Sequence, residues 1–200
     1  MGRGRSFTSG LTWAPRCAMG DLNVTLDVLG FQSGEVFQLV AITFPEKTSP
    51  VAESFEVGNE DNLALARSFV ERFDGKRNLY ICLNPLKAKR SAKVRDQDIA
   101  TSRVLLVDAD PTDAGDGTLE FCQKAKRLLA QGTIVSSGRG HQLWVSHDPD
   151  LTEWRASVLE ALRKRFGNPT VKIDATHDIS RIARLPGTIN LKTGKRSKIL

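Results

Sequence analysis

The sequence contains little of what builds disulfide frameworks, zinc sites or membrane spans. Its three cysteines, Cys17, Cys82 and Cys122, are scattered along 200 residues, and none forms a CxxC pair. This pattern excludes a disulfide scaffold or a zinc ribbon and favours a reducing, cytoplasmic setting. No apolar run approaches the roughly 18 residues of a membrane span, and no Walker A motif is present, so neither a membrane protein nor a P-loop ATPase is expected.

Charge is distributed unevenly along the chain. Residues 151–200 contain 11 Lys and Arg against 4 Asp and Glu, a net +7, whereas residues 1–150 contain 18 against 19, a net −1. The hydrophobic share of 40% and the charged share of 26% are ordinary for a globular domain. The basic C-terminal quarter predicts a polyanionic partner such as nucleic acid or nucleotide phosphates, with a solvated basic helix and tail as the alternative.

The hydrophobic pattern predicts one domain of alternating strands and helices over residues 21–200, preceded by a flexible leader at 1–20. Strands are predicted at 35–44, 78–83, 104–110, 133–136, 142–145 and 171–174, and helices at 59–73, 118–130 and 150–166. Leu128 and Trp154 are expected on apolar helix faces. Residues 45–58 are expected in a loop, and the residues up to Arg184 in a turn or short helix. The antiparallel pair within 133–145 favours an α+β sheet over a Rossmann fold.

Two aspartates at the end of an apolar segment are the first candidate for a functional site. Asp108 and Asp110 close the run at 104–110, and on a strand both side chains project from the same face. Two neighbouring carboxylates repel each other, so a divalent cation between them would stabilise the pair. The spacing excludes an EF-hand loop, because the sixth position counted from Asp108 is Asp113 and not glycine.

A glycine-rich turn is the second candidate. Ser137, Arg139 and His141 lie in the segment Ser-Gly-Arg-Gly-His, between two predicted short strands. Its glycines let the backbone approach a ligand closely, and the hydroxyl, guanidinium and imidazole groups can bind phosphate oxygens. The structural alternative is a glycine hairpin with an incidental histidine.

The third candidate combines an aspartate with a basic segment. Asp174 follows a predicted strand and would complete a set of three oxygen ligands suited to Mg²⁺ or Mn²⁺. Arg181 and Arg184 are three residues apart, so one helical turn would place both on one face, where they could clamp a triphosphate. The alternative is that these arginines pair with Asp174 and Asp178.

Together the three motifs resemble those of the archaeo-eukaryotic primase superfamily, in particular its RepB-like plasmid and phage primase-polymerases. The apolar strand ending in Asp-x-Asp at 105–110 is similar to the first family motif. The segment 137–141 is similar to the Ser-x-His motif, with a longer spacing, and Ile-Asp at 173–174 to the third motif. The run Arg-Leu-Pro-Gly-Thr-x-Asn-x-Lys at 184–192 is similar to a segment that follows in this branch. The resemblance covers about residues 75–195.

The resemblance implies an α+β primase-polymerase catalytic core, with an RRM-like mixed or antiparallel sheet flanked by helices. It implies template-directed nucleotidyl transfer on single-stranded DNA, by which primers are made or extended and pyrophosphate is released. Two Mg²⁺ or Mn²⁺ ions would clamp the attacking and leaving oxygens. The implied catalytic and metal-binding residues are Asp108, Asp110 and Asp174. The implied nucleotide-binding residues are Ser137, Arg139, His141, Arg181, Arg184 and Lys192.

The implied partners are single-stranded DNA, nucleoside triphosphates and a replicative helicase in cis or in trans, with no membrane. The domain at 21–200 could be excised from a longer replication protein. Two other functions stay open at this point. A non-catalytic, DNA-binding replication initiator would keep the same fold without the reaction. A metal-dependent glycosyltransferase of the GT-A type also uses Asp-x-Asp, but the third aspartate and the basic C-terminal quarter argue against it.

Overall fold

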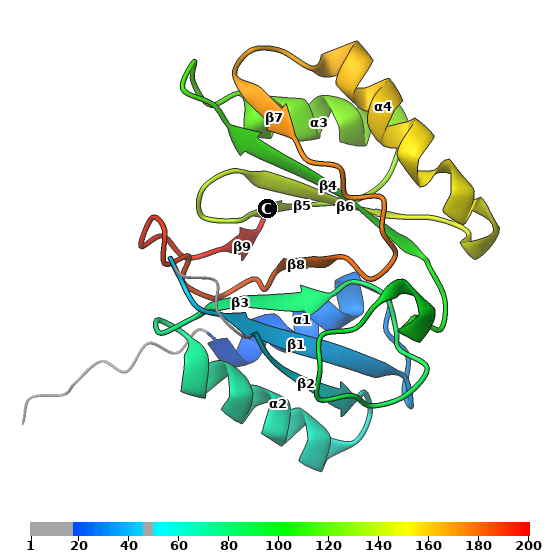
Figure 1. The fold of residues 1–200 in the computed structure, drawn as a ribbon, viewed down its shortest axis with the longest axis vertical. Coiled ribbons are helices and arrows are strands. Elements are labelled where there is room, and N and C mark those ends of the chain that lie inside the picture. Colours follow the sequence, from blue (N-terminus) through cyan, green and yellow to red (C-terminus); the bar gives the residue numbers. More distant parts are fainter. Residues whose placement is uncertain (1–17, 46–49) are drawn as a thin grey trace, which may run out of the picture.

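The computed structural model describes residues 18–45 and 50–200, which fold into two lobes that each contain one antiparallel sheet (Figure 1). This arrangement confirms the predicted α+β class, although the strands form two separate sheets and not a single one. The predicted leader lies outside the described residues except for 18–20, which begin the first helix. Within the described ranges, none of the helices combines the length and the apolar character needed to cross a membrane.

The first lobe is built on a four-stranded sheet in the order β2-β1-β3-β8, with two helices packed on it (Figure 1). Its elements are α1 (Ala18–Val28), β1 (Val36–Ile42), β2 (Val51–Glu56), α2 (Glu60–Phe73), β3 (Asn78–Cys82) and β8 (Ile182–Arg184). Phe37, Phe55 and Phe69 join sheet and helix in its core, with successive ring centroids 5.6 and 6.1 Å apart. The Asn59 side chain caps α2 by accepting from the backbone N–H of Asn62.

The second lobe is built on a five-stranded sheet in the order β7-β4-β6-β5-β9. Its elements are β4 (Val104–Pro111), α3 (Thr118–Leu129), β5 (Thr133–Ser136), β6 (His141–Ser146), α4 (Arg155–Phe166), β7 (Val171–Ile173) and β9 (Lys198–Ile199). Two 3₁₀ turns, η1 (Asp96–Asp98) and η2 (Pro149–Trp154), precede β4 and α4. In Figure 1, α3 and α4 lie on the side of this sheet that faces away from the first lobe, and β8 is the strand of the first sheet nearest to the second.

Strand β4 divides its side chains between two environments. Val107 and Ala109 pack in the core formed with α3 and α4, whereas Leu106 joins the core of the first lobe. Side chains alternate along a strand, so Asp108 and Asp110 follow on the same face as Leu106 and project toward the first lobe. The alternation inferred from the sequence therefore places both carboxylates between the two lobes.

Among the described residues, β2, β8 and the short β9 form where the sequence analysis predicts no strand. The predicted loop at 45–58 contains β2, and the predicted turn or helix before Arg184 contains β8. β2 pairs with β1 from Val36↔Glu56 to Ala41↔Val51, and β8 pairs with β3. Neither segment has a clear apolar alternation, and each takes its conformation from hydrogen bonds to a neighbouring strand. Helix α1 likewise lies where the pattern indicated no element.

Two residues expected on apolar helix faces are exposed. The relative exposure is 55% for Trp154 and 47% for Leu128. Trp154 ends the 3₁₀ turn η2, which includes a non-helical residue at Leu151, so it does not share the helical phase of α4. On α3 the buried face is centred on Phe121 and Ala125, and Leu128 lies at its margin. The expectation that both side chains are buried is wrong.

Candidate functional site

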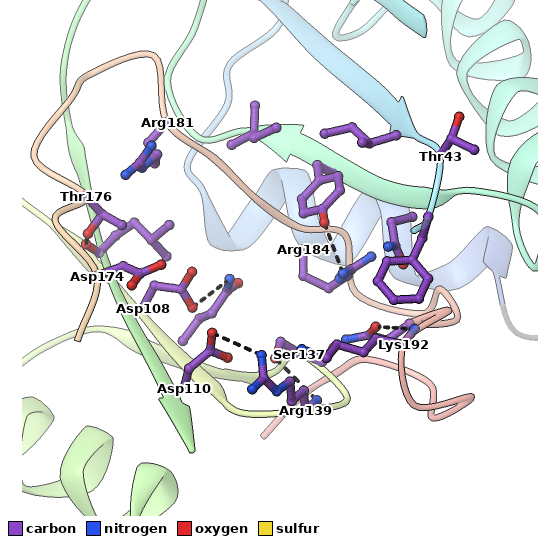
Figure 2. A pocket seen from close by; sticks show the side chains of 18 residues that line it. Thr43, Asp108, Asp110, Ser137, Arg139, Asp174, Thr176, Arg181, Arg184 and Lys192 are labelled. Carbon is purple, nitrogen blue, oxygen red and sulfur yellow. Dashed lines mark hydrogen bonds and ion pairs between the residues drawn. The ribbon is translucent and has the colours of Figure 1, made fainter. Parts of the chain in front are cut away.

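A pocket of about 550 Å³ lies between the two lobes (Figure 2). The first lobe contributes Ile42, Thr43, Phe44, Asn78 and Tyr80. The second lobe contributes Leu106, Asp108, Asp110, Ser137, Arg139, Gln142, Asp174 and Thr176. The returning C-terminal segment contributes Arg181, Ile182, Arg184, Asn190 and Lys192. Eight of the nine sequence-predicted site residues are thus brought to one pocket.

Two adjacent strands supply the acidic side of the pocket. Asp108 and Asp110 extend from β4, and Asp174 follows β7, which pairs with β4 through Ala109↔Ile173. The backbone N–H of Asp174 donates to the Asp108 carbonyl at 3.1 Å. Antiparallel pairing therefore brings Asp174 beside Asp110 and Asp108, which precede it by 64 and 66 residues, and Figure 2 shows all three on one side of the pocket.

Burial and two neighbouring carboxylates act on Asp108. Burial and the charges of Asp110 and Asp174 together raise the pKa of Asp108 to about 6, against opposing effects of the Gln142 hydrogen bond and the Arg181 charge. Neighbouring carboxylates disfavour the ionised form of such a carboxyl. A cation bound between the carboxylates would favour that ionised form. Carboxylate oxygens are also the ligands that Mg²⁺ and Mn²⁺ prefer, so the donor set fits such an ion in kind.

Each carboxylate currently has an internal partner. Asp108 accepts from Gln142 at 3.2 Å, Asp110 pairs with Arg139 at 3.6 Å, and Asp174 pairs with Lys172 at 3.3 Å. In the described part of the chain, no three His, Cys, Asp or Glu side chains are gathered closely enough to ligate one ion. An ion bound by these carboxylates would therefore compete with Arg139 for Asp110 and with Lys172 for Asp174.

Arg184 is a buried cation that pairs with no carboxylate among the described residues. It is 6% exposed, and its guanidinium stacks 4.4 Å from the Tyr80 ring centroid and donates from Nη2 to the Tyr80 hydroxyl at 3.1 Å. Its Nε and Nη1 are buried and have no hydrogen-bond acceptor in residues 18–45 and 50–200, and burial lowers the pKa of Arg184. Free guanidinium donors at a pocket wall suit a planar anion such as a phosphate or carboxylate.

The other two basic residues of the C-terminal segment are placed differently. Arg181 donates from Nη2 to the Ala175 carbonyl at 2.5 Å and pairs with Asp178 at 3.4 Å, so it is partly engaged within its own loop. It does not lie on a helical turn with Arg184, because the segment is extended, yet both line the pocket. Lys192 lines the pocket beside Asn190, whose Oδ1 accepts from the Lys192 backbone N–H at 3.0 Å.

The glycine-rich turn is closed by its serine. Ser137 Oγ donates to the Gly140 carbonyl and accepts from the Gly140 N–H, both at 3.1 Å, so the hydroxyl is engaged within the turn. Gly140 is required because a Cβ there would lie 2.2 Å from the Ala109 carbonyl oxygen. Asn190 and Thr193 donate to the Ser137 and Gly138 carbonyls at 2.9 Å. The C-terminal segment thereby fixes the turn that carries Arg139.

His141 does not line the pocket, unlike the other predicted site residues. It pairs in register with Ala109, whose side chain is in the core with α3, and its Nδ1 lies 2.8 Å from Thr118 Oγ1 at the start of α3. Burial lowers the pKa of His141. Gln142 occupies the pocket position instead, because it pairs with Asp108 and adjacent strand residues face opposite ways.

Sequence reasoning missed several other pocket residues. Tyr80, Thr176 and the segment 42–44 carry no motif, and residues 42–44 belong to the part of the chain without recognised motifs. Gln142 could have been found from the alternation of β6, because Trp144 two residues later also lies on the face toward the first lobe. The pocket positions of the other missed residues depend on how the two lobes are placed relative to each other.

The fold is similar to that of the AEP domain of the primase-polymerase (PrimPol) of cyanophage S-2L, with a TM-score of 0.62 and 19% sequence identity. The alignment covers 93% of this chain and 91% of that one. No protein-family model matches the chain, and no curated protein matches it. The predicted primase-polymerase fold is therefore confirmed, while the RepB-like branch stays a prediction.

Proposed function

We propose that this protein is a template-directed nucleotidyltransferase of the archaeo-eukaryotic primase superfamily, which makes or extends primers on single-stranded DNA. The observation that carries the proposal is the charge pattern of the pocket. Three carboxylates lie on one side, and a buried guanidinium with free donors lies on the other (Figure 2). A metal-bound nucleoside triphosphate has the complementary pattern. The likeness in fold to a domain named as a primase-polymerase supports the same class of reaction.

In this reaction the 3′-hydroxyl of a primer or initiating nucleotide attacks the α-phosphorus of the incoming nucleotide. A P–O bond forms, the bond from the α-phosphorus to the bridging oxygen breaks, pyrophosphate leaves, and the hydroxyl proton passes to water. Asp108, Asp110 and Asp174 would hold divalent ions, which when bound stabilise the attacking and leaving oxygens.

The cations of the pocket would bind the phosphate groups. Arg184 offers two free donors, and Lys192 adds a positive charge on the same side. Arg139 would exchange Asp110 for a phosphate oxygen when the carboxylate binds metal, and Arg181 would add its charge near Asp108. Ser137 would act through the shape of its turn, because its hydroxyl is already engaged.

The template would lie along the basic C-terminal segment. Lys195 and Lys198 make no ion pair with a described acidic residue, so both are available to DNA phosphates. Contacts of this kind are independent of sequence and weaken as the salt concentration rises. A replicative helicase, in cis or in trans, is proposed as a further partner.

The test is incorporation of labelled deoxynucleoside or ribonucleoside triphosphates on a primed single-stranded template, with Mg²⁺ or Mn²⁺ and with EDTA as the control. We expect metal-dependent extension by the wild type and none by the Asp108→Ala/Asp110→Ala double variant. An unprimed template in a parallel reaction separates primer synthesis from extension. Equal incorporation by wild type and double variant would contradict the proposed site.

A non-catalytic, DNA-binding initiator is the second candidate, and one observation favours it. All three carboxylates are held by internal partners and are not gathered around one ion position. Salt-sensitive binding of single-stranded DNA, without incorporation under any metal condition, would support this function. The glycosyltransferase alternative receives no support, because the sheets are antiparallel and the fold is similar to that of a primase-polymerase domain.

A further inference from the structure

Gln142 has an unusual position for a glutamine. It is 5% exposed, lines the pocket and pairs in register with Asp108. Its Nε2 donates to Asp108 Oδ1 at 3.2 Å, the hydrogen bond drawn at Asp108 in Figure 2. Its Oε1 is buried, and no group of the described residues donates to it. One end of the amide therefore holds a carboxylate, and the other end is an unfilled acceptor at the same pocket wall.

The other buried glutamine on a strand shows what a purely structural role looks like. Gln38 in β1 is fully buried, and its Nε2 donates to the carbonyl of Ala92 at 3.0 Å. Its Oε1 accepts from the backbone N–H of Val94 at 3.2 Å. Buried polar atoms are nearly always satisfied in this way. The Oε1 of Gln142 therefore needs a donor that the described residues do not supply, such as a bound water molecule.

The chemistry of the acceptor limits what that donor can be. Phosphate oxygens are acceptors, so they cannot satisfy Oε1, whereas water bound to a cation is a strong donor. The same amide contacts Asp108, so water on an ion ligated by that carboxylate would lie within its reach. Groups that hydrogen-bond to metal ligands in this way commonly set the orientation of the ligand and the affinity for the metal.

We propose that Gln142 is a positioning residue of the metal site: its Nε2 orients Asp108, and its Oε1 accepts a hydrogen bond from water bound to the ion. The inference rests on the proposed function, because it requires that Asp108 binds a divalent cation. His141, for which the motif predicts nucleotide binding, does not compete for this position, because its side chain faces α3.

The test measures Mn²⁺ binding without nucleotide, by the electron paramagnetic resonance signal of free Mn²⁺, on the full chain. Gln142→Met keeps the volume and removes both polar ends, so we expect the Kd for Mn²⁺ to rise about 10- to 100-fold. Gln142→Glu keeps an acceptor at this place, and we expect it to bind Mn²⁺ at least as tightly as the wild type. Gln38→Met is the matched control, which we expect to lower the melting temperature and leave the Kd unchanged.

The outcomes separate this inference from the proposed function. If the wild type binds no Mn²⁺, the proposed metal site fails. If the wild type binds Mn²⁺ and folded Gln142→Met binds it equally well, the role of Gln142 is refuted while the metal site stands. If Gln142→Glu is as weak as Gln142→Met, the acceptor role is refuted. A larger loss of Mn²⁺ affinity in His141→Asn than in Gln142→Met would also refute the assignment of this role to Gln142.

Discussion

The two ends of β4 each lie near a buried arginine, and the two arginines are satisfied very differently. At the start of β4, Arg155 is 2% exposed and none of its nitrogens is left unfilled. It donates to the carbonyls of Val104, His177 and Asp178 at 2.7, 2.9 and 3.1 Å, and lies 3.1 Å from both Ser102 Oγ and His147 Nε2. Burial lowers the pKa of Arg155 to about 10.

Arg184 lines the pocket into which the other end of β4 carries its aspartates, and it is 6% exposed. Among the described residues it donates only to Tyr80, and two of its nitrogens find no acceptor there. A buried cation with a full set of acceptors ties segments together, whereas one with free donors carries a cost that a bound anion can offset. We therefore expect Arg155 to stabilise the fold and Arg184 to bind an anion.

The largest effect on activity is expected at the aspartates of the pocket. Asp108→Asn should lower nucleotide incorporation at least about 10²–10³-fold, the scale of losing a preorganised electrostatic group. Asp113→Asn, in the exposed turn after β4, is the control and should keep wild-type activity. Primer-extension rates measure both. Full activity in Asp108→Asn would remove the metal-ligand role from this residue.

The same residue predicts a pH dependence of stability without metal. Folding raises the pKa of Asp108 from 3.8 to about 6, so its contribution to stability is complete below about pH 4 and is lost as the pH rises through 6. Asn imitates the neutral carboxyl. The variant Asp108→Asn should therefore match the wild type near pH 4 and exceed it by about 3 kcal/mol at pH 8, in the absence of divalent ions. Urea unfolding at both pH values measures the difference, and a pH-independent gap would contradict it.

At the structural end, Arg155→Met should lower the free energy of unfolding by about 3 kcal/mol, because several buried acceptors lose their donor. Arg127→Met, at an exposed position on α3, is the control and should change it little. Chemical denaturation measures both variants. A loss no larger than that of the control would show that the Arg155 contacts do not hold the structure together.

Arg184→Met should weaken ligand binding without lowering stability, the reverse of what is expected for Arg155→Met. We expect nucleotide affinity with Mg²⁺ to fall about 10- to 100-fold, the scale of hydrogen bonds to a charged group. The melting temperature should stay equal or rise, because a buried cation without a counterion is removed. Calorimetric titration and thermal unfolding of the same sample test both. A stability loss like that of Arg155→Met would end the distinction between the two arginines.

The smallest effect is expected at Trp154, the residue directly before Arg155. Trp154 is largely exposed, so Trp154→Gln should change the free energy of unfolding by less than about 0.5 kcal/mol. Urea unfolding checks this prediction. A change above about 1 kcal/mol would show that the side chain packs as the helical pattern had suggested.

Much of the local structure could be predicted from residue periodicity. The strand at 133–136 and the end of the helix at Phe73 agree with the structure, as does the course of β4 within one residue. The edge strands β2 and β8 could not be predicted, because their conformation depends on the strands beside them. The pocket positions of Tyr80 and the segment 42–44 could not be predicted for the same reason, because they depend on tertiary contacts. These residues form the pocket wall of the first lobe.

The sequence by itself determined that Asp108 and Asp110 share one face of a strand, because alternation is a property of the extended backbone. It also determined which residue types could meet a metal ion and phosphates. Only the tertiary structure decided that Asp174 joins the pair and that Gln142, not His141, faces the pocket. The register of β4 against β6 and β7 sets both, and register is fixed by core packing across strands distant in sequence.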